Sequence, residues 1–416
     1  MSFFTQMSYA DSGSLDAFSR LRVSNANSVI SIQDQYTAGP IQMESAATGA
    51  GVTPAYDGNT RMVTLSCTNT GTSFTQSYIY SPYMPGHSQV VAMTGVLGTG
   101  VASTTVDVGL FDAGNGIIFR QNGNTNLQFI LRTSTSGSVS NANIVAQSAW
   151  SIDKFDGTGP SGITLDVTKT FILVIDYQYL GMGRVRLGFD INGVLYYAHQ
   201  FLNANMLTVP YMQQPALPVQ MLITSTGGSK TAYFKCATVQ SEGGDFEALG
   251  FRFSTPESTA TAGNGARVPI ISLRHKTTFN SISNRQLLLP EAVNLNVTGA
   301  NSVFWELVVG GAYGGQSFSD VNSTYSGMEY SSTPGTFTNL TGGIVVMSGY
   351  VPGAGSGSTA APSPIRVTIS PITFLRTPLS LDRSGAVRAM GTLTLLVSGL
   401  GATSATRATI SYLEVR

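Results

Sequence analysis

Three histidines are the residues of this chain best suited to acid–base or metal chemistry, and their spacing argues against both. His87, His199 and His275 lie far apart, with no HxxxH or HxH pair that could hold a metal ion. Their order along the chain does not exclude a Ser-His-Asp triad, but no serine has the GxSxG context of a nucleophile elbow. We therefore expect packed structural histidines, no catalytic residues and no metal site.

Acidic residues gather near turns between residues 107 and 166 and could bind calcium through their oxygens. Turn aspartates more commonly accept hydrogen bonds from their own backbone, which is the reading we favour. Carboxylate pairs for glycoside hydrolysis need particular separations, and the sequence singles out no such pair. The aspartates in question are Asp107, Asp112, Asp153, Asp156 and Asp166.

The glycine-rich stretches and the two cysteines offer no cofactor site either. Residues 95–100 (GVLGTG) and 181–188 (GMGRVRLG) lack P-loop spacing and no helix is expected after them, so both are read as turns. Cys67 and Cys236 are too few and too far apart for a disulfide framework or a zinc site. We expect free thiols, no cofactor and no enzymatic activity.

Composition narrows the classes of partner. The 22 basic residues balance 22 acidic ones without a long basic run, which disfavours nucleic acid. The start of the chain lacks the pattern of a signal peptide, and the apolar runs are too short to span a membrane. These features predict a soluble protein made in a cytoplasm. Charged residues are only 11% of the chain, which suits a neutral surface rich in hydroxyl groups.

Strand periodicity dominates the rest of the sequence. In residues 184–191 (RVRLGFDI) apolar side chains alternate with Arg184, Arg186 and Asp190, and Asn192-Gly193 then supplies a type I′ hairpin turn. Residues 171–175 (FILVI) are apolar throughout, as in a central strand covered on both faces. The predicted fold is all-β: an extended N-terminal arm (1–60), an antiparallel jelly-roll-like β-sandwich (61–245), a linker (246–265) and a second antiparallel β-sandwich (266–416).

One compact patch interrupts the predicted arm, at residues 15–23 (LDAFSRLRV). An arm of this kind orders on another surface, so we take the patch as an interface. Phe18 and Leu21 would be buried against a neighbouring subunit, while Arg20 and Arg22 would bond to its carboxylates or carbonyls. The alternative is that the patch adds a strand or turn to its own first sandwich. The candidate interface residues are Leu15, Asp16, Phe18, Arg20, Leu21 and Arg22.

Two resemblances follow from these segments. Residues 171–201 are similar in pattern to the central hairpin of concanavalin/laminin-G-type sandwiches, many of which bind sugars or proteins. DAFSRLRVSNANSVI, VAMTGVL, residues 151–193, VPIISLRHKTTFNSISNRQLLLPEAVNLNV and FWELVVGG resemble a family of structural proteins of tailed bacteriophages. That resemblance implies a virion component whose partners are other virion proteins and copies of itself. The alternatives are a receptor- or glycan-binding module of a fibre or tail tip, which would contact host surface glycans, and a weaker third, a polysaccharide-degrading enzyme.

Overall fold

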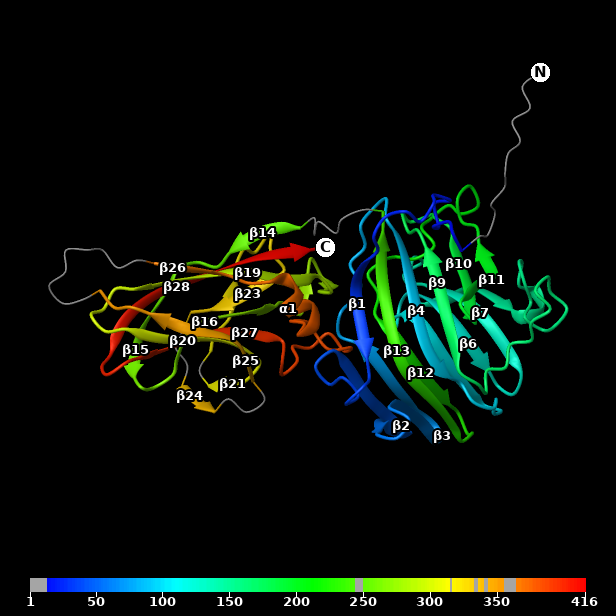
Figure 1. Cartoon of the computed structure of the whole chain (residues 1–416), viewed down its shortest axis with the longest axis horizontal. Coiled ribbons are helices and arrows are strands. Elements are labelled where there is room, and N and C mark those ends of the chain that lie inside the picture. The colour runs from blue at the N-terminus through cyan, green and yellow to red at the C-terminus, as the bar shows by residue number, and fades with distance from the viewer. Residues whose placement is uncertain (1–12, 244–249, 315, 333–335, 340–342, 355–363) are drawn as a thin grey trace, which may run out of the picture. The chain divides into compact units, whose positions relative to one another are not determined.

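The chain folds into two compact units of strands, residues 1–247 and 248–416, and each is described by itself. The computed structural model describes residues 13–243, 250–314, 316–332, 336–339, 343–354 and 364–416. Within these residues the regular structure is strand, apart from a 3-10 turn (η1, Gln147–Ala149) and a short helix (α1, Pro371–Arg376) (Figure 1). The all-β prediction is confirmed.

The strands of the first unit form one curled antiparallel sheet. Their order across it is β11-β10-β9-β4-β13-β3-β12-β5-β6-β7-β8, with β1 on β13 and β2 on β3. Their bounds are β1 Asn27–Gln33, β2 Met43–Asp57, β3 Met62–Ser77, β4 Ser88–Val96, β5 Thr104–Phe111, β6 Gly116–Asn122, β7 Asn126–Thr133, β8 Ser140–Ala146, β9 Phe171–Tyr177, β10 Val185–Ile191, β11 Val194–Phe201, β12 Val219–Ser225 and β13 Lys230–Glu242.

Aromatic side chains show that this sheet closes on itself as a sandwich. Phe119 on β6 and Phe129 on β7 lie far along the sheet from β10, yet their ring centroids are 5.2 Å and 6.3 Å from that of Phe189 on β10. Trp150 stacks on Phe129 at 4.2 Å. These rings therefore form the interior between two layers of the sheet, and each strand also has an outer face.

The hairpin between β10 and β11 has the turn that its residues predict. Asn192 and Gly193 have φ of 57° and 84°, and the carboxylate of Asp190 accepts the Gly193 N–H at 2.9 Å. The register shifts by one residue at Gly188, where a Cβ atom would come within 2.2 Å of the Tyr196 carbonyl oxygen. Glycine is required at that position because the neighbouring backbone fills the space.

The predicted arm and the predicted linker are both shorter than expected. Strands β1 and β2 pair with β13 and β3, so residues 27–57 belong to the first sandwich, while residues 1–12 lie outside the described part. The pairing of β2 with β3 includes hydroxyl contacts such as Thr48–Thr72 and Ser45–Thr75, which leave no apolar alternation to detect. Likewise β14 and β15 place residues 251–264 in the second unit.

The second unit is also a sandwich of two layers. One layer holds β14, β15, β28, β19 and β26; the other holds β22, β23, β16, β27, β20 and β25; and β15 joins them by pairing with both β28 and β27. Side chains such as Leu395, Ile410 and Trp305 fill the core between them.

The second unit also has a short hairpin, β17–β18, and a two-stranded sheet of β21 and β24. The bounds are β14 Phe251–Ser254, β15 Ser258–Asn264, β16 Val268–His275, β17 Thr278–Phe279, β18 Ile282–Ser283, β19 Leu287–Val297, β20 Val303–Val309, β21 Ala312–Gly314, β22 Ser319–Asp320, β23 Met328–Ser331, β24 Thr336–Asn339, β25 Ile344–Val351, β26 Ile365–Thr368, β27 Thr392–Gly399 and β28 Ser404–Val415.

Candidate functional site

Residues 13–24, which we call the N-terminal segment, form a compact turn held by their own hydrogen bonds. Asp16 organises it: Oδ1 accepts the backbone N–H groups of Phe18 at 2.9 Å and Arg20 at 2.8 Å, and Oδ2 accepts the Arg20 Nε at 2.8 Å. A β-bridge joins Leu15 to Leu21 across the turn. Because the Asp16 carboxylate accepts backbone N–H groups of its own segment, the turn keeps this shape without hydrogen bonds from its backbone to the sheet.

The segment lies against the outer face of β9, β10 and β11 and is fixed there by a buried cluster of charges. Asp176 and Arg186, both 0% exposed, are direct cross-strand neighbours and bond to each other. Asp176 Oδ2 also accepts Arg22 Nη2 at 2.6 Å and the Tyr197 hydroxyl at 2.7 Å. Arg186 in turn donates to the Leu15 carbonyl oxygen at 2.7 Å.

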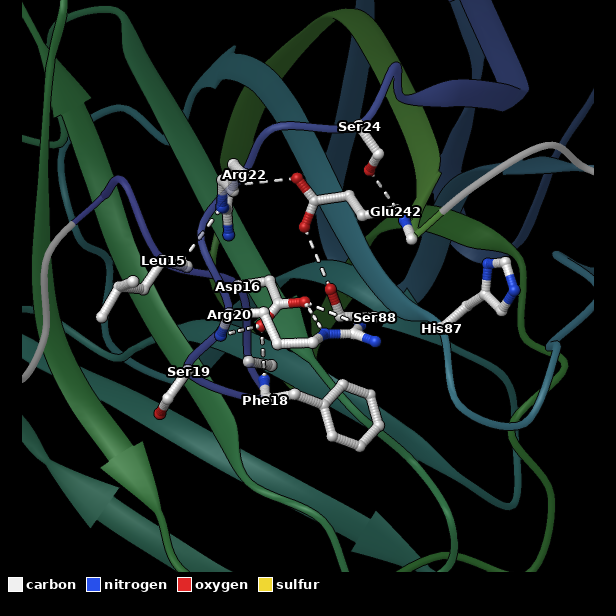
Figure 2. Close-up of polar contacts among 12 residues, drawn as sticks. Leu15, Asp16, Phe18, Ser19, Arg20, Arg22, Ser24, His87, Ser88 and Glu242 are labelled. Carbon is white, nitrogen blue, oxygen red and sulfur yellow. Dashed lines mark hydrogen bonds and ion pairs between the residues drawn. The ribbon is translucent and has the colours of Figure 1, made fainter.

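A second carboxylate, that of Glu242 at the end of β13, also contacts Arg22 (Figure 2). Glu242 Oε1 lies 3.5 Å from Arg22 Nη1, and its Oε2 accepts the Ser88 hydroxyl at 3.0 Å. The Gly243 N–H donates to the Ser24 hydroxyl at 3.1 Å. We call Asp176, Arg186, Tyr197, Glu242 and the neighbouring Leu195 side chain the docking face.

The electrostatics of the docking face favour binding of a cation over acid–base chemistry. Burial disfavours the charge on Arg22, but the carboxylates of Asp176 and Glu242 outweigh it and raise the Arg22 pKa. Burial, helped by the Asp176 carboxylate, raises the pKa of Tyr197, so its hydroxyl stays protonated as a donor. Three donors, from Arg22, Arg186 and Tyr197, converge on Asp176 Oδ2.

The structure places the candidate interface residues in three different environments. Leu15 and Asp16 are buried, Phe18 is half-buried, and Leu21 is 63% exposed. Within one chain Arg20 pairs with Asp16 and Arg22 with the docking face, and their bonding to a neighbouring subunit stays a prediction. A buried carboxylate such as Asp176 requires a partner, and Arg22 supplies it. The structure of the single chain thus has the alternative arrangement, a turn on its own sandwich.

Sequence reasoning missed the docking face, although one signal was present. Asp176 interrupts the apolar run of β9, and a lone charge in such a strand must be neutralised. Arg186, in the adjacent strand, was seen only as a polar position of the alternating pattern. Tyr197 was predicted as an exposed aromatic able to stack on a sugar or a neighbouring subunit, but it is 3% exposed and bonds to Asp176; Glu242 gave no signal in its local sequence.

An apolar surface adjoins the N-terminal segment. Two loops, 178–184 and 202–211, are tied together by bonds from Asn203 to the Gly183 carbonyl and from the Tyr211 N–H to the Gly181 carbonyl. Arg184 in the first loop donates to the Ala17 carbonyl at 3.3 Å, so the segment borders it. Six side chains here are 42 to 74% exposed and form what we call the apolar loop patch: Leu180, Met182, Leu202, Met206, Leu207 and Val209.

The histidines occupy packing positions. His199 stacks on Phe129, its Nδ1 accepts the Ser151 N–H at 3.1 Å, and burial lowers its pKa to about 4. His275 lies within 3.0 Å of the Gln286 carbonyl oxygen, and burial likewise lowers its pKa to about 4. Both rings are neutral at pH 7.

The turn aspartates bond to their own loops. Asp112 Oδ1 accepts the N–H groups of Gly114 and Asn115, each at 2.8 Å, and Asp153 and Asp166 accept nearby backbone N–H groups in the same way. In the described part of the chain no three His, Cys, Asp or Glu side chains gather in a metal-binding group. The two cysteines are free thiols there.

A cavity of about 500 Å³ opens at the opposite end of β9 and β10. Its lining combines apolar side chains with polar ones, including Thr94, Asp166, Asp190 and Lys235 beside Phe171. The Lys235 Nζ donates to the Asp34 and Arg61 carbonyl oxygens, which orients it beside the opening.

Comparison with known proteins yields similarity in structure only. No family model and no curated protein matches the chain. A Shewanella oneidensis protein of unknown function is 9% identical, with a TM-score of 0.34 over 54% of this chain and 89% of its own. A Bacillus licheniformis β-glucanase (11%, 0.31, 53% and 99%) and a Bauhinia forficata lectin in complex with GalNAc (11%, 0.29, 52% and 98%) are similarly distant. Among the described residues no helix is long and apolar enough to cross a membrane.

Proposed function

We propose that this protein is a non-enzymatic structural component of a bacteriophage virion that works by binding copies of itself and other virion proteins. The observation that supports it best is the number of exposed apolar side chains on the first unit: Leu21 and Val23 are 63% and 85% exposed, and the apolar loop patch adds six more. Contiguous apolar patches beyond a few hundred Å² mark interaction sites. The place in a virion rests on the resemblance of residues 16–30 and the other quoted segments to phage structural proteins.

The absence of charge in the apolar loop patch fits contact with another protein. Residues 178–183 and 202–211 contain no Asp, Glu, Lys or Arg, so burial of the patch costs little desolvation. Leu180 also adopts a φ of 38°, a left-handed conformation that is unfavourable for leucine. Strained residues persist only where the surrounding structure enforces them, and they cluster at functional sites.

The test is self-association and incorporation into particles. Sedimentation velocity over a range of concentrations should show reversible association of the natural chain. Leu202→Ser with Met206→Ser should weaken it at least tenfold and should reduce incorporation into particles. The matched control is Val139→Ser, which changes an equally exposed apolar residue in another loop. A natural chain that stays monomeric and is absent from purified particles refutes the proposal.

A second candidate, a receptor- or glycan-binding module, is favoured by the 500 Å³ cavity. Its size lies in the range of ligand sites, and its mixed lining offers hydroxyl-binding groups beside apolar side chains such as Ile163 and Leu165. A glycan array distinguishes the two proposals, because saturable binding to one sugar class, lost in Asp190→Ala with Lys235→Ala, supports recognition. Binding unchanged by those substitutions counts against the cavity.

A further inference from the structure

We infer that the N-terminal segment exchanges between copies of the chain, so that residues 15–22 of one copy dock on the docking face of another. This inference rests on the proposed self-association and adds its mechanism. The contacts between the segment and the docking face are the same whether the two belong to one chain or to two chains, because every copy has the same residues at both places.

The segment is built as a transferable unit. Its turn is closed by Asp16 and by the bridge from Leu15 to Leu21, all within the segment. It adds no strand to the sheet, and it contacts the docking face through the Arg22 guanidinium and the Leu15 carbonyl. Undocking therefore breaks side-chain contacts and leaves every strand pair intact.

Residues 23–26, which connect the N-terminal segment to β1, are suited to carrying the segment to another copy of the chain. Residues 23–26 are exposed, and in the described part of the chain a hydrogen bond from the Gly243 N–H to the Ser24 hydroxyl ties them to the end of β13. Four extended residues span only about 14 Å. Exchange over that reach requires two docking faces side by side, and such an approach would bury Leu21 and Val23 between the copies.

The charge of the docking face selects this segment as its occupant. Without Arg22, the carboxylates of Asp176 and Glu242 face Arg186 alone, so the face carries one uncompensated negative charge. An arginine beside an exposed carbonyl, as in Arg22 and Leu15, meets that need, and every other copy of the chain carries the same pair. Because contacts within and between chains are equivalent, concentration decides between them, and dense packing in an assembly favours exchange.

Cysteine cross-linking of the full chain tests this directly. A Cβ atom at Gly13 would lie 3.3 Å from the Leu195 Cβ, close to the separation of about 3.8 Å found in disulfides. Gly13→Cys and Leu195→Cys chains of different tag length are mixed and oxidised mildly. The expected product is a mixed disulfide whose yield rises with concentration and falls at least fivefold when the Gly13→Cys chain also carries Arg22→Ala.

The control for random collision is Gly58→Cys mixed with Leu195→Cys, since residue 58 has nothing within 4 Å of its Cβ position. The doubly substituted chain, Gly13→Cys with Leu195→Cys, reports docking within one chain. Rapid closure of that internal disulfide, with mixed products no faster than the Gly58→Cys control, overturns the exchange. If sedimentation still shows self-association in that case, the proposed function survives and only its mechanism fails.

Discussion

Replacing Asp176 with asparagine tests whether the docking face is held by charge. The side chain keeps its shape but loses the negative charge that neutralises Arg186, which is 0% exposed, and Arg22 beside it. Breaking a buried ion pair by removing one partner costs about 3–5 kcal/mol. The asparagine oxygen can still accept one donor, so we expect a loss of about 3 kcal/mol, a shift of roughly 1 M or more in the urea midpoint.

The two tryptophans allow each unit to be followed alone. Trp150 lies in the first unit and Trp305 in the second, and both are buried. In a Trp305→Phe background, fluorescence reports the unfolding of the first unit without assuming that the whole chain unfolds in one step. Asp190→Asn is the matched control, because its oxygen can still cap the exposed hairpin turn, and it should change stability by less than about 0.5 kcal/mol.

A cost of less than about 1 kcal/mol for Asp176→Asn, or one no larger than that of Asp190→Asn, would refute a docking face held by charge. Either result would mean that the cluster is hydrated or that Arg186 finds another partner. If Asp176→Asn does not fold at all, Tyr197→Phe provides a milder test. That change removes one of the three donors to Asp176 and should cost about 1 kcal/mol.

The remaining predictions concern pH, a glycine and the second unit. Burial raises the Asp34 pKa to about 7 and lowers the His199 pKa to about 4. Between pH 4 and 6.5 the folded unit therefore holds a proton on Asp34 that the unfolded chain has lost. Over the same range the unfolded chain holds a proton on His199 that the folded unit has lost. The two effects oppose each other, and Asp34→Asn should reveal stability that falls as pH falls, by up to about 1.4 kcal/mol per unit, in urea titrations followed by Trp150 fluorescence. Gly188→Ala should cost about 2 kcal/mol in the same assay, against almost nothing for Gly58→Ala. Glu414→Ala, which leaves buried donors unpaired, should cost the second unit about 2–3 kcal/mol, measured by Trp305 fluorescence.

Local patterns predicted much of the fold because strands with one buried face carry a visible period. The hairpin at Asn192-Gly193 and the central position of β9 both follow from residues close together in the sequence. Strand β2 was missed because its residues, many of them threonine and glycine, show no apolar alternation. It is held as a strand by its pairing with β3. Pairing over long separations was out of reach, since nothing near Arg22 indicates that Asp176 will lie beside it.

Strand β13 has a consequence for how the protein is made. It pairs with β1, β3 and β4, whose residues leave the ribosome long before it does. The first unit cannot close until about 240 residues have been synthesised, so early strands must wait with unpaired edges. Contacts across such separations form slowly, and nascent chains with open edges are prone to aggregate. Slower translation just after β13, or a chaperone that shields β3 and β4, should therefore raise the yield of folded protein in the cell.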